Sequence, residues 1–582
     1  MNQMKTERRD GMLIHWDMPI PMDDGITLRA DIFRPDDENG RYPVIMSLGP
    51  YGKGVSFSGS HYAFAWKRIE SAYPEITRGT SNKYANWEAV DPEKWVPDGF
   101  ICIRVDSRGA GRSPGVLDIF SQREAKDYYN CIEWAAAQPW CTGKVGLNGI
   151  SYYAINQWQV AALQPPHLTA ICPFEGMNDF YREWYRHGGI LNPFMLFWYP
   201  RQVITVQNGV GERGYTSPIT GEYASGPQTL SEEELAKNRA DYIRDLYDVP
   251  TVNNTLSTER SVDLSKVKVP VLSCANWGGS HLHLRGNVEG WLDAASEEKW
   301  LEVHGLEHFT EFYTDYGLSL QKRFFNHFLK GENTWADQPP VQLKLRRVDG
   351  SFVLRGEQEW PIQRTAWTKY YLDTNSLSLS AAGAGTAGKL TFDALGEGLT
   401  FWTAPLEKEM EITGPLASSL FISSSTKDAD VFLVLRVVSP AGEEVTFISA
   451  DDQKGLVATG WLRASHRKLD TKRTLPYRPY HSHDEIQPLT PGEIYNMDVE
   501  IWPTSVIVPA GYKIGLAVLG RDYVLPGDGP WPIVLGVEAR GHGACMHNDE
   551  RDRPKEIFGG KTTLYTGKDN PSYLLLPVIP IK

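Results

Sequence analysis

The sequence lacks the features of a membrane-spanning or exported protein. No stretch approaches the run of about eighteen consecutive apolar residues that a transmembrane helix requires. Residues 1–13 carry charges but no apolar segment of the kind found in a secretory signal. Cysteine is scarce, with 6 in 582 residues, and its spacing matches neither a zinc site nor a redox motif. We therefore expect a protein of the reducing cytoplasm that has no membrane partner.

An excess of positive charge is also lacking. Lys and Arg total 59 against 72 Asp and Glu, and the resulting net charge of −13 argues against nucleic acid as a partner. Hydrophobic residues make up 41% and charged residues 23% of the chain, which are ordinary values for a globular protein and exclude a fibre or a disordered chain. A chain of 582 residues is too long for a single core, so two or three domains are expected.

The first 340 residues alternate between strand-like and helix-like segments. Strands are expected at residues 27–33, 42–48, 100–105, 168–174, 269–274 and 300–303, and helices at residues 121–138 and 318–329. This alternation with short connections is typical of a parallel α/β sheet. Such a sheet places its functional residues at the carboxyl ends of its strands.

Two further regions do not share this alternation. Residues 178–262 are rich in aromatic residues and loops, with a charged helix expected at residues 231–247, and we interpret this region as a helical cap over the site. After residue 341, short alternating strands separated by Gly, Pro and Asp turns predict an all-β sandwich or jelly roll. The expected domains are an α/β core at residues 1–177 and 263–340, the cap at 178–262 and the jelly roll at 341–582.

A candidate nucleophile lies between a strand-like run and a helix. The apolar run ends in Gly149, Ser151 follows after one residue, and a helix is expected over residues 154–163. This is the layout of a nucleophile elbow, in which a tight turn lifts a serine hydroxyl to the edge of the sheet. Tyr153 breaks the strict Gly-x-Ser-x-Gly pattern, and taken alone the triplet also suits an ordinary loop.

A serine in this position needs a base and donors for an oxyanion. In a parallel α/β hydrolase the base is a histidine on the loop after the last strands, where His308 lies, whereas His304 is expected to pack or to cap the strand. The amide of Tyr152 follows the nucleophile, and Tyr51 lies in the turn after an earlier strand. The alternatives are a structural histidine and a packing tyrosine.

Several short motifs occur together in one order and spacing. They are Asp-Ser-Arg-Gly at residues 106–109, Ser-Pro-Gly at 113–115, Trp-Cys-Thr-Gly at 140–143, Gly-Ile-Ser-Tyr at 149–152, Val-Pro at 269–270 and Ala-Gly-Tyr-Lys-Ile at 510–514. Together they resemble the CocE/NonD hydrolases, a family that includes cocaine esterase, α-amino acid ester hydrolase and X-prolyl dipeptidyl peptidase relatives. The resemblance covers essentially the whole chain.

The resemblance implies a fold and a set of catalytic residues. The implied fold is an α/β-hydrolase core with an inserted helical cap, followed by a carboxyl-terminal jelly roll. The implied nucleophile is Ser151, the base is His308, and the oxyanion hole is formed by the Tyr51 hydroxyl with the Tyr152 amide. The chain departs from the family by Ala154, where a glycine is usual, a small change that the elbow should tolerate.

The catalytic acid is the larger departure from the family pattern. The family's aspartate, in a Gly-Trp-Tyr-Asp segment, corresponds to Gly279 of this chain. The best candidate for a replacement is Glu175, which directly follows an expected strand. A carboxylate buried there without a partner would be costly, so its presence calls for a role. Glu307 and a bare Ser-His dyad are weaker alternatives. As a structural residue, Glu175 would instead pair with Arg182 or Arg186.

The expected function is a cofactor-free serine hydrolase that cleaves small esters, or amides, through an acyl-enzyme intermediate. The alternatives are an X-prolyl aminopeptidase, an acyltransferase, and a non-catalytic binding protein with a degenerate site. An aminopeptidase would need acidic cap residues to hold an ammonium group, for which Glu212, Glu222 and residues 232–234 are candidates. His281 and His283 lack a nearby third ligand, so no metal is expected. The acyl group, the leaving group and assembly into a homo-oligomer stay open.

Overall fold

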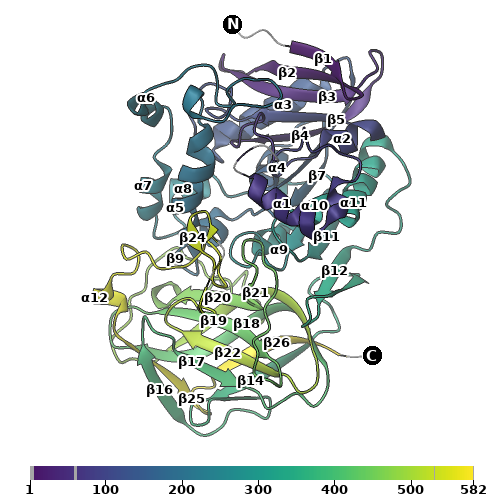
Figure 1. Cartoon of the computed structure of the whole chain (residues 1–582). Helices are drawn as coiled ribbons and strands as arrows, with labels where there is room; N and C mark the ends of the chain where they lie inside the picture. The colour runs from purple at the N-terminus through teal and green to yellow at the C-terminus, as the bar shows by residue number, and fades with distance from the viewer. Residues whose placement is uncertain (1–4, 58–59, 61, 530, 532, 581–582) are drawn as a thin grey trace.

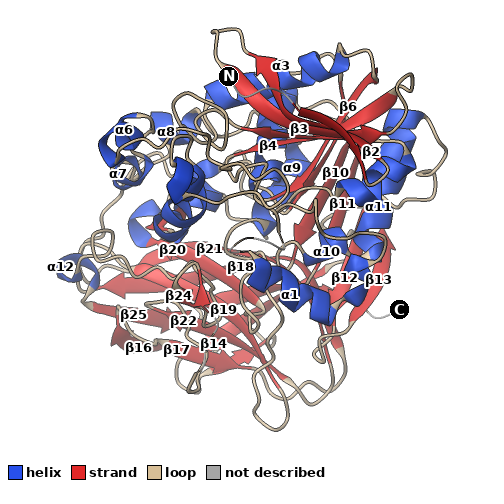
Figure 2. Ribbon diagram, turned by 45° about the horizontal axis from the view of Figure 1, so that its top comes forward, coloured by secondary structure: helices blue, strands red, loops and turns tan. Residues whose placement is uncertain are grey.

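The computed structural model describes residues 5–57, 60, 62–529, 531 and 533–580. The chain forms an α/β body, at the top of Figure 1, and a β body below it. Figure 2 shows that helices flank the sheet of the first body, whereas strands make up most of the second. The predicted fold class, an α/β-hydrolase core followed by an all-β domain, is confirmed.

One mixed sheet organises the first body. Among the described residues its strands, in pairing order, are β1 (Lys5–Arg9), β2 (Met12–Pro21), β3 (Thr27–Pro35), β5 (Ile101–Asp106), β4 (Tyr42–Gly49), β6 (Cys141–Ile150), β7 (Leu168–Phe174), β10 (Val271–Asn276), β11 (Lys299–His304), β12 (Val341–Arg346) and β13 (Phe352–Glu357). Strands β5, β4, β6, β7, β10, β11 and β12 pair in parallel. The sheet thus continues through β12 and β13, beyond the expected domain boundary at residue 340.

Helices cover both faces of this sheet, which explains why its central strands are buried on both sides. These helices are α3 (Gln122–Ala136), α4 (Tyr152–Ala162), α9 (Leu284–Asp293) and α11 (Asp315–Phe325). In β4, Val44 and Met46 belong to the same core cluster as residues of α3 and α4. Ile45 points to the other face and shares a cluster with Phe324 and Phe325 of α11. Because these strands run parallel, their carboxyl ends lie at one edge of the sheet, between the two helix layers.

The segment between β7 and β10 consists of short helices and loops beside the sheet, at the left of Figure 1, with one small hairpin of β8 (Arg186–His187) and β9 (Ile190–Leu191). Its α-helices are α5 (Phe194–Trp198), α6 (Glu232–Lys237), α7 (Tyr242–Tyr247) and α8 (Thr255–Thr258). The single helix expected at residues 231–247 is therefore two helices. Ser231 and Glu234 form a capping box at the start of α6, and the side chain of Asp241 caps the start of α7. A second cap signal inside one polar stretch marks a break that helical periodicity alone does not reveal.

The second body is a sheet that closes on itself. Its principal strands are β14 (Ala366–Asp373), β15 (Ser378–Ser380), β17 (Leu399–Trp402), β18 (Met410–Ser424), β19 (Asp430–Val438), β20 (Ala458–Arg463), β21 (Tyr495–Val508), β22 (Lys513–Leu519) and β26 (Tyr573–Ile579), with β16 (Gly388–Asp393) and β25 (Lys561–Thr566) added at β18. Closure occurs because β18 pairs with both β21 and β26. Alternate residues of β19, such as Leu433 and Leu435, point into its core.

Buried charge connects the two bodies. Arg285 of α9 contacts Glu183 at 2.8 Å and Glu500 of β21 at 3.0 Å. Its side chain is 3% exposed and that of Glu183 is fully buried, so this ion pair lies away from water. Loops of the second body can therefore approach the edge of the first sheet in a fixed position, and two of them contribute to the cavity described below.

Helices of the described ranges are all too short or too polar to cross a membrane. The six cysteines all lie in the described part of the chain, where each is a buried free thiol. A buried thiol of this kind packs as a small apolar side chain.

Candidate active site

Ser151 occupies a tight turn between β6 and α4. Its φ of 56° and ψ of −114° lie outside the regions that L-residues favour, and its amide donates to the carbonyl of Phe174 at 3.0 Å. The turn requires small neighbours, because a Cβ on Gly149 would lie 2.4 Å from the Cβ of Tyr153. A Cβ on Gly176 would lie 2.9 Å from the Cβ of Ala154. This is the geometry of a nucleophile elbow.

Ser151 opens into a cavity of about 220 Å³. Its apolar and aromatic walls include Tyr51, Phe64, Trp87, Phe194, Trp198, Leu282, Phe309, Ile533 and Leu535. Its ionisable groups are Arg68, Glu88, His281, His283, His308 and Asp451. Asp451 comes from a loop of the second body and Ile533 from its short strand β23 (Ile533–Val534), so all parts of the chain contribute to the same cavity. Concave, largely apolar sites with a few polar groups are typical of small-molecule binding.

His308 lies on the loop after β11, beside the carboxylate of Glu175. Nδ1 of His308 is 2.8 Å from Oε2 of Glu175, which directly follows β7 and is fully buried. The other oxygen of Glu175 lies 3.3 Å from Nε2 of His304 and accepts a hydrogen bond from Asn276 at 3.2 Å. Burial opposes ionisation, but the charge of His308 and the hydrogen bond to His304 hold the pKa of Glu175 well below its usual range.

The other residues considered as partners of His308 or Glu175 pair with different side chains. Glu307 contacts Arg68 at 2.6 Å and accepts a hydrogen bond from Gln453. Arg182 pairs with Asp179, and Arg186 pairs with Asp552, both at 2.6 Å. Glu175 is therefore the carboxylate that the structure places at Nδ1 of His308.

The hydroxyl of Ser151 has a partner that the sequence did not indicate. Its Oγ lies 3.2 Å from Nε2 of His283, whereas Nε2 of His308 lies 3.0 Å from Oε1 of Glu88. The two imidazole rings stack, with centroids 5.3 Å apart and an interplanar angle of 19°. Among the described residues, Ser151 and His308 thus face the same cavity but form no direct hydrogen bond.

The two histidines have opposite electrostatic environments. Burial disfavours the cation of His308, but the carboxylates of Glu175 and Glu88 outweigh burial and raise its pKa to about 10. Burial, together with the charge of His308, lowers the pKa of His283 to about 3. His308 is consequently the basic member of the pair, and His283 is neutral at ordinary pH.

Tyr51 and Tyr152 both lie at the edge where β4 and β6 end. The hydroxyl of Tyr51 accepts a hydrogen bond from the indole of Trp198 at 3.1 Å, so its own proton is available toward the cavity that it lines. Burial, and next the charge of Glu88, raise the pKa of Tyr51 well above its usual value, which keeps it protonated. Tyr152 begins α4, where a backbone N–H has no partner within the helix.

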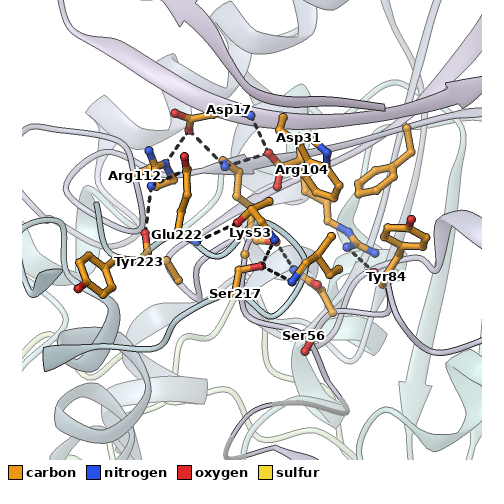
Figure 3. Close-up of a pocket in the computed structure, with 17 residues that line it drawn as sticks. Asp17, Asp31, Lys53, Ser56, Tyr84, Arg104, Arg112, Ser217, Glu222 and Tyr223 are labelled. Atoms are coloured by element: carbon orange, nitrogen blue, oxygen red, sulfur yellow. Dashed lines mark hydrogen bonds and ion pairs between the residues drawn. The ribbon is translucent and has the colours of Figure 1, made fainter. Parts of the chain in front are cut away.

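A buried charge network around Lys53 fixes the turn that carries Tyr51, and Figure 3 shows Lys53 with its partners Asp17 and Asp31. Nζ of Lys53 lies 2.9 Å from Asp31 and 3.3 Å from Asp17, and its amide donates to Asp106 at 2.6 Å. The carbonyl of Lys53 accepts a hydrogen bond from the side chain of Asn86 at 2.6 Å. The same network therefore anchors the Tyr51 turn and the segment that leads to Glu88.

Sequence reasoning missed Glu88 and His283. His283 belonged to a pair considered for metal binding, but His281 contacts His542 at 2.9 Å, and no group of side chains in the described ranges could hold a metal ion. Glu88 lies in a loop with no motif, and its positive φ of 59° is invisible in the sequence.

Comparisons with known proteins agree with this architecture. Residues 24–310 match the family of X-Pro dipeptidyl-peptidases (S15 family), and residues 333–575 match the X-Pro dipeptidyl-peptidase C-terminal non-catalytic domain. Cocaine esterase from Rhodococcus sp. (strain MB1 Bresler) is 24% identical over 96% of this chain and 97% of its own length. The solved structure of an α-amino acid ester hydrolase has a TM-score of 0.67, covers 98% of this chain and 97% of its own, and at 17% identity supports the fold alone.

A more similar structure is that of a CocE/NonD family hydrolase from Staphylococcus aureus. It is 32% identical, with a TM-score of 0.82, and the match covers 98% of this chain and 94% of that protein. An elbow serine, a histidine and carboxylates gather at one edge of the sheet. This match and the two family matches show that the chain belongs to the CocE/NonD family of hydrolases.

Proposed function

We propose that the protein is a serine hydrolase that cleaves small carboxylic esters through an acyl-enzyme on Ser151. The observation that carries this proposal is the strained elbow of Ser151, which opens into a largely apolar cavity beside the His308–Glu175 pair. Strained backbone conformations of this kind cluster at active sites, where the reaction needs a fixed geometry.

His308 is the base in this mechanism, and Glu175 orients it. The Oγ of Ser151 forms a bond to the acyl carbon while its proton passes to Nε2 of His308. The alcohol then leaves with that proton, and water repeats the sequence to release the acid. His283 is a poor base because its pKa is lowered to about 3 by burial and by the charge of His308.

The oxyanion of each tetrahedral intermediate would be held by two donors, the hydroxyl of Tyr51 and the amide of Tyr152. Burial of Tyr51 places its hydroxyl dipole in a region of low dielectric, where it stabilises a developing negative charge more than in water. The apolar walls of the cavity favour an uncharged acyl or aryl group.

The aminopeptidase alternative gains no support from the acidic cap residues. Glu222 pairs with Arg112, Glu232 with Arg213 and Glu233 with Lys237, and Glu234 caps its own helix. Neither these four residues nor Glu212 belongs to the lining of the cavity. A peptidase would therefore need an ammonium site elsewhere.

Labelling with a fluorophosphonate tests the nucleophile. We expect the wild-type protein to be labelled and Ser151→Ala not to be labelled, while hydrolysis of an aryl ester exceeds that of a Gly-Pro anilide. Labelling in equal amount in Ser151→Ala would exclude this serine, and no labelling of the wild type would favour a non-catalytic binding protein. A preference for the anilide would favour an aminopeptidase. The cytoplasmic location and assembly into a homo-oligomer stay predictions.

A further inference from the structure

Glu88 is held beside the elbow in a strained conformation. Its side chain is 3% exposed, and its φ of 59° is unusual for a residue other than glycine. Its carbonyl accepts the amide of Ile150 at 3.1 Å, which ties Glu88 to the residue before Ser151. A buried carboxylate at such a position costs stability unless it has a partner, and its partner is His308.

The contact between Glu88 and His308 conflicts with the catalytic role of His308. Each imidazole nitrogen has one hydrogen-bonding position, and Nδ1 is already used by Glu175. While Nε2 donates to Glu88, it cannot accept the proton of Ser151. The hydroxyl of Ser151 meanwhile bonds to His283. Both reacting groups are thus engaged with partners other than each other.

We propose that Glu88 is a positioning residue that holds Nε2 of His308 away from Ser151 in the resting enzyme, so that turnover begins when this contact opens. His308 then loses its Nε2 proton to solvent in the cavity. The hydroxyl of Ser151 gives up its hydrogen bond with His283 and donates one to Nε2 of the neutral His308. This proposal rests on the proposed function, because it assigns His308 as the base.

Other ionisable groups also face this contact. They are Glu175, His283 and Asp451, with the hydroxyls of Tyr51, Tyr62 and Tyr153 on the side of Glu88. Burial disfavours the cation of His308, but the two carboxylates together raise its pKa to about 10. Removal of one carboxylate should therefore make His308 easier to deprotonate, whereas the tyrosines stay neutral.

The test is the pH dependence of kcat/KM for an aryl ester in wild type and Glu88→Gln. Glutamine keeps the size of the side chain but removes its charge. We expect the acidic limb of the profile to move to lower pH by about one unit, which raises kcat/KM on that limb about tenfold. Glu88→Asp keeps the negative charge, so the acidic limb of its kcat/KM profile should lie near that of wild type. The matched control is Glu307→Gln, adjacent to His308 but paired with Arg68, and its limb should not move.

The alternatives give different results. If Glu88→Gln lowers kcat/KM at every pH and its limb does not move, Glu88 supports substrate binding or folding, and the proposal is wrong. The rate of fluorophosphonate labelling separates the two proposals: no labelling of wild type at any pH refutes both, whereas labelling with the same pH profile in wild type and Glu88→Gln refutes only the role of Glu88.

A measurement on the wild-type protein covers the case in which Glu88→Gln does not fold. Nitrogen-15 NMR of labelled histidines should show both nitrogens of His308 protonated at pH 7, with the signals assigned by their loss in His308→Gln. Detection of a neutral His308 at that pH would refute the proposed contact.

Discussion

Glu175 and His308 are 133 positions apart in the sequence, and a carboxylate oxygen of the first lies 2.8 Å from Nδ1 of the second. The strand order produces this contact. Glu175 directly follows β7, and His308 lies on the loop after β11. One strand, β10, lies between β7 and β11 in the sheet. A carboxylate one strand nearer the nucleophile is thus the partner of Nδ1 of His308, whereas Gly279 lies in the cavity wall and has no side chain.

Glu175→Gln should lower kcat by about 10³- to 10⁴-fold, because an amide neither fixes the tautomer of His308 nor stabilises its cation. Glu307→Gln should change kcat little, since that carboxylate contacts Arg68 and Gln453. Steady-state kinetics with an aryl ester checks both variants. Similar losses in the two variants would indicate a general effect of charge near His308, and an unchanged Glu175→Gln would remove Glu175 from the mechanism.

The sequence predicts the parts of the site that follow directly from strands. Ile150 pairs with Phe174 across β6 and β7, so the next residues, Ser151 and Glu175, must emerge side by side at the sheet edge. His308 follows the same rule after β11. Such positions can be inferred because a hydrophobic run marks where a strand ends.

Glu88 and His283 could not be predicted in this way. Both lie in irregular segments, where position depends on tertiary contacts such as the bond from Ile150 to the carbonyl of Glu88. The first sheet shows a similar limit, since β12 has the alternating pattern of a β domain but pairs with β11. Sequence pattern identifies a strand, whereas the choice of partner is a tertiary property.

Tyr51→Phe should lower kcat by about 10²- to 10³-fold with little change in KM, because the hydroxyl would act on the oxyanion and not on the ground-state ester. Trp198 loses its acceptor in this variant, so a decrease of about 1 kcal/mol in the free energy of unfolding is also expected. Kinetics and denaturant unfolding measure the two effects separately. The control is Tyr313→Phe, whose hydroxyl bonds to the carbonyl of Ala89 outside the cavity. Equal kcat values for the two variants would contradict a donor role for Tyr51.

Lys53→Met should lower the free energy of unfolding by about 3–5 kcal/mol, because it leaves the buried carboxylate of Asp31 without its cation, whereas Asp17 keeps Arg112 at 3.0 Å. The turn that carries Tyr51 should also loosen, with a loss of kcat in the protein that still folds. Denaturant unfolding at neutral pH measures the first effect. Lys555→Met, at an exposed pair with Glu550, should change stability by less than about 1 kcal/mol. A Lys53→Met protein as stable as Lys555→Met would mean that water compensates the buried carboxylate of Asp31.

The buried His304 should make the free energy of unfolding decrease as the pH rises through the alkaline range. Burial disfavours its cation, but Glu302, at 2.7 Å, and Glu175 raise the pKa of His304 to about 10. A histidine with a raised pKa contributes stability that is complete below its unfolded pKa of about 6.5 and that is lost as the pH rises through the folded value. Between these limits each such group lowers the free energy of unfolding by about 1.4 kcal/mol per pH unit.

His304→Gln should therefore reduce this slope by about 1.4 kcal/mol per unit between pH 7 and pH 9, although the variant is less stable at pH 7. The contribution of His308, whose pKa is raised in the same way, should remain. Urea unfolding at several pH values gives both slopes. Leu329→Ala, a buried apolar truncation, should cost about 2–5 kcal/mol and leave the slope unchanged. Parallel curves for wild type and His304→Gln would show that His304 is neutral in the folded protein, and that Glu302 carries the proton between them.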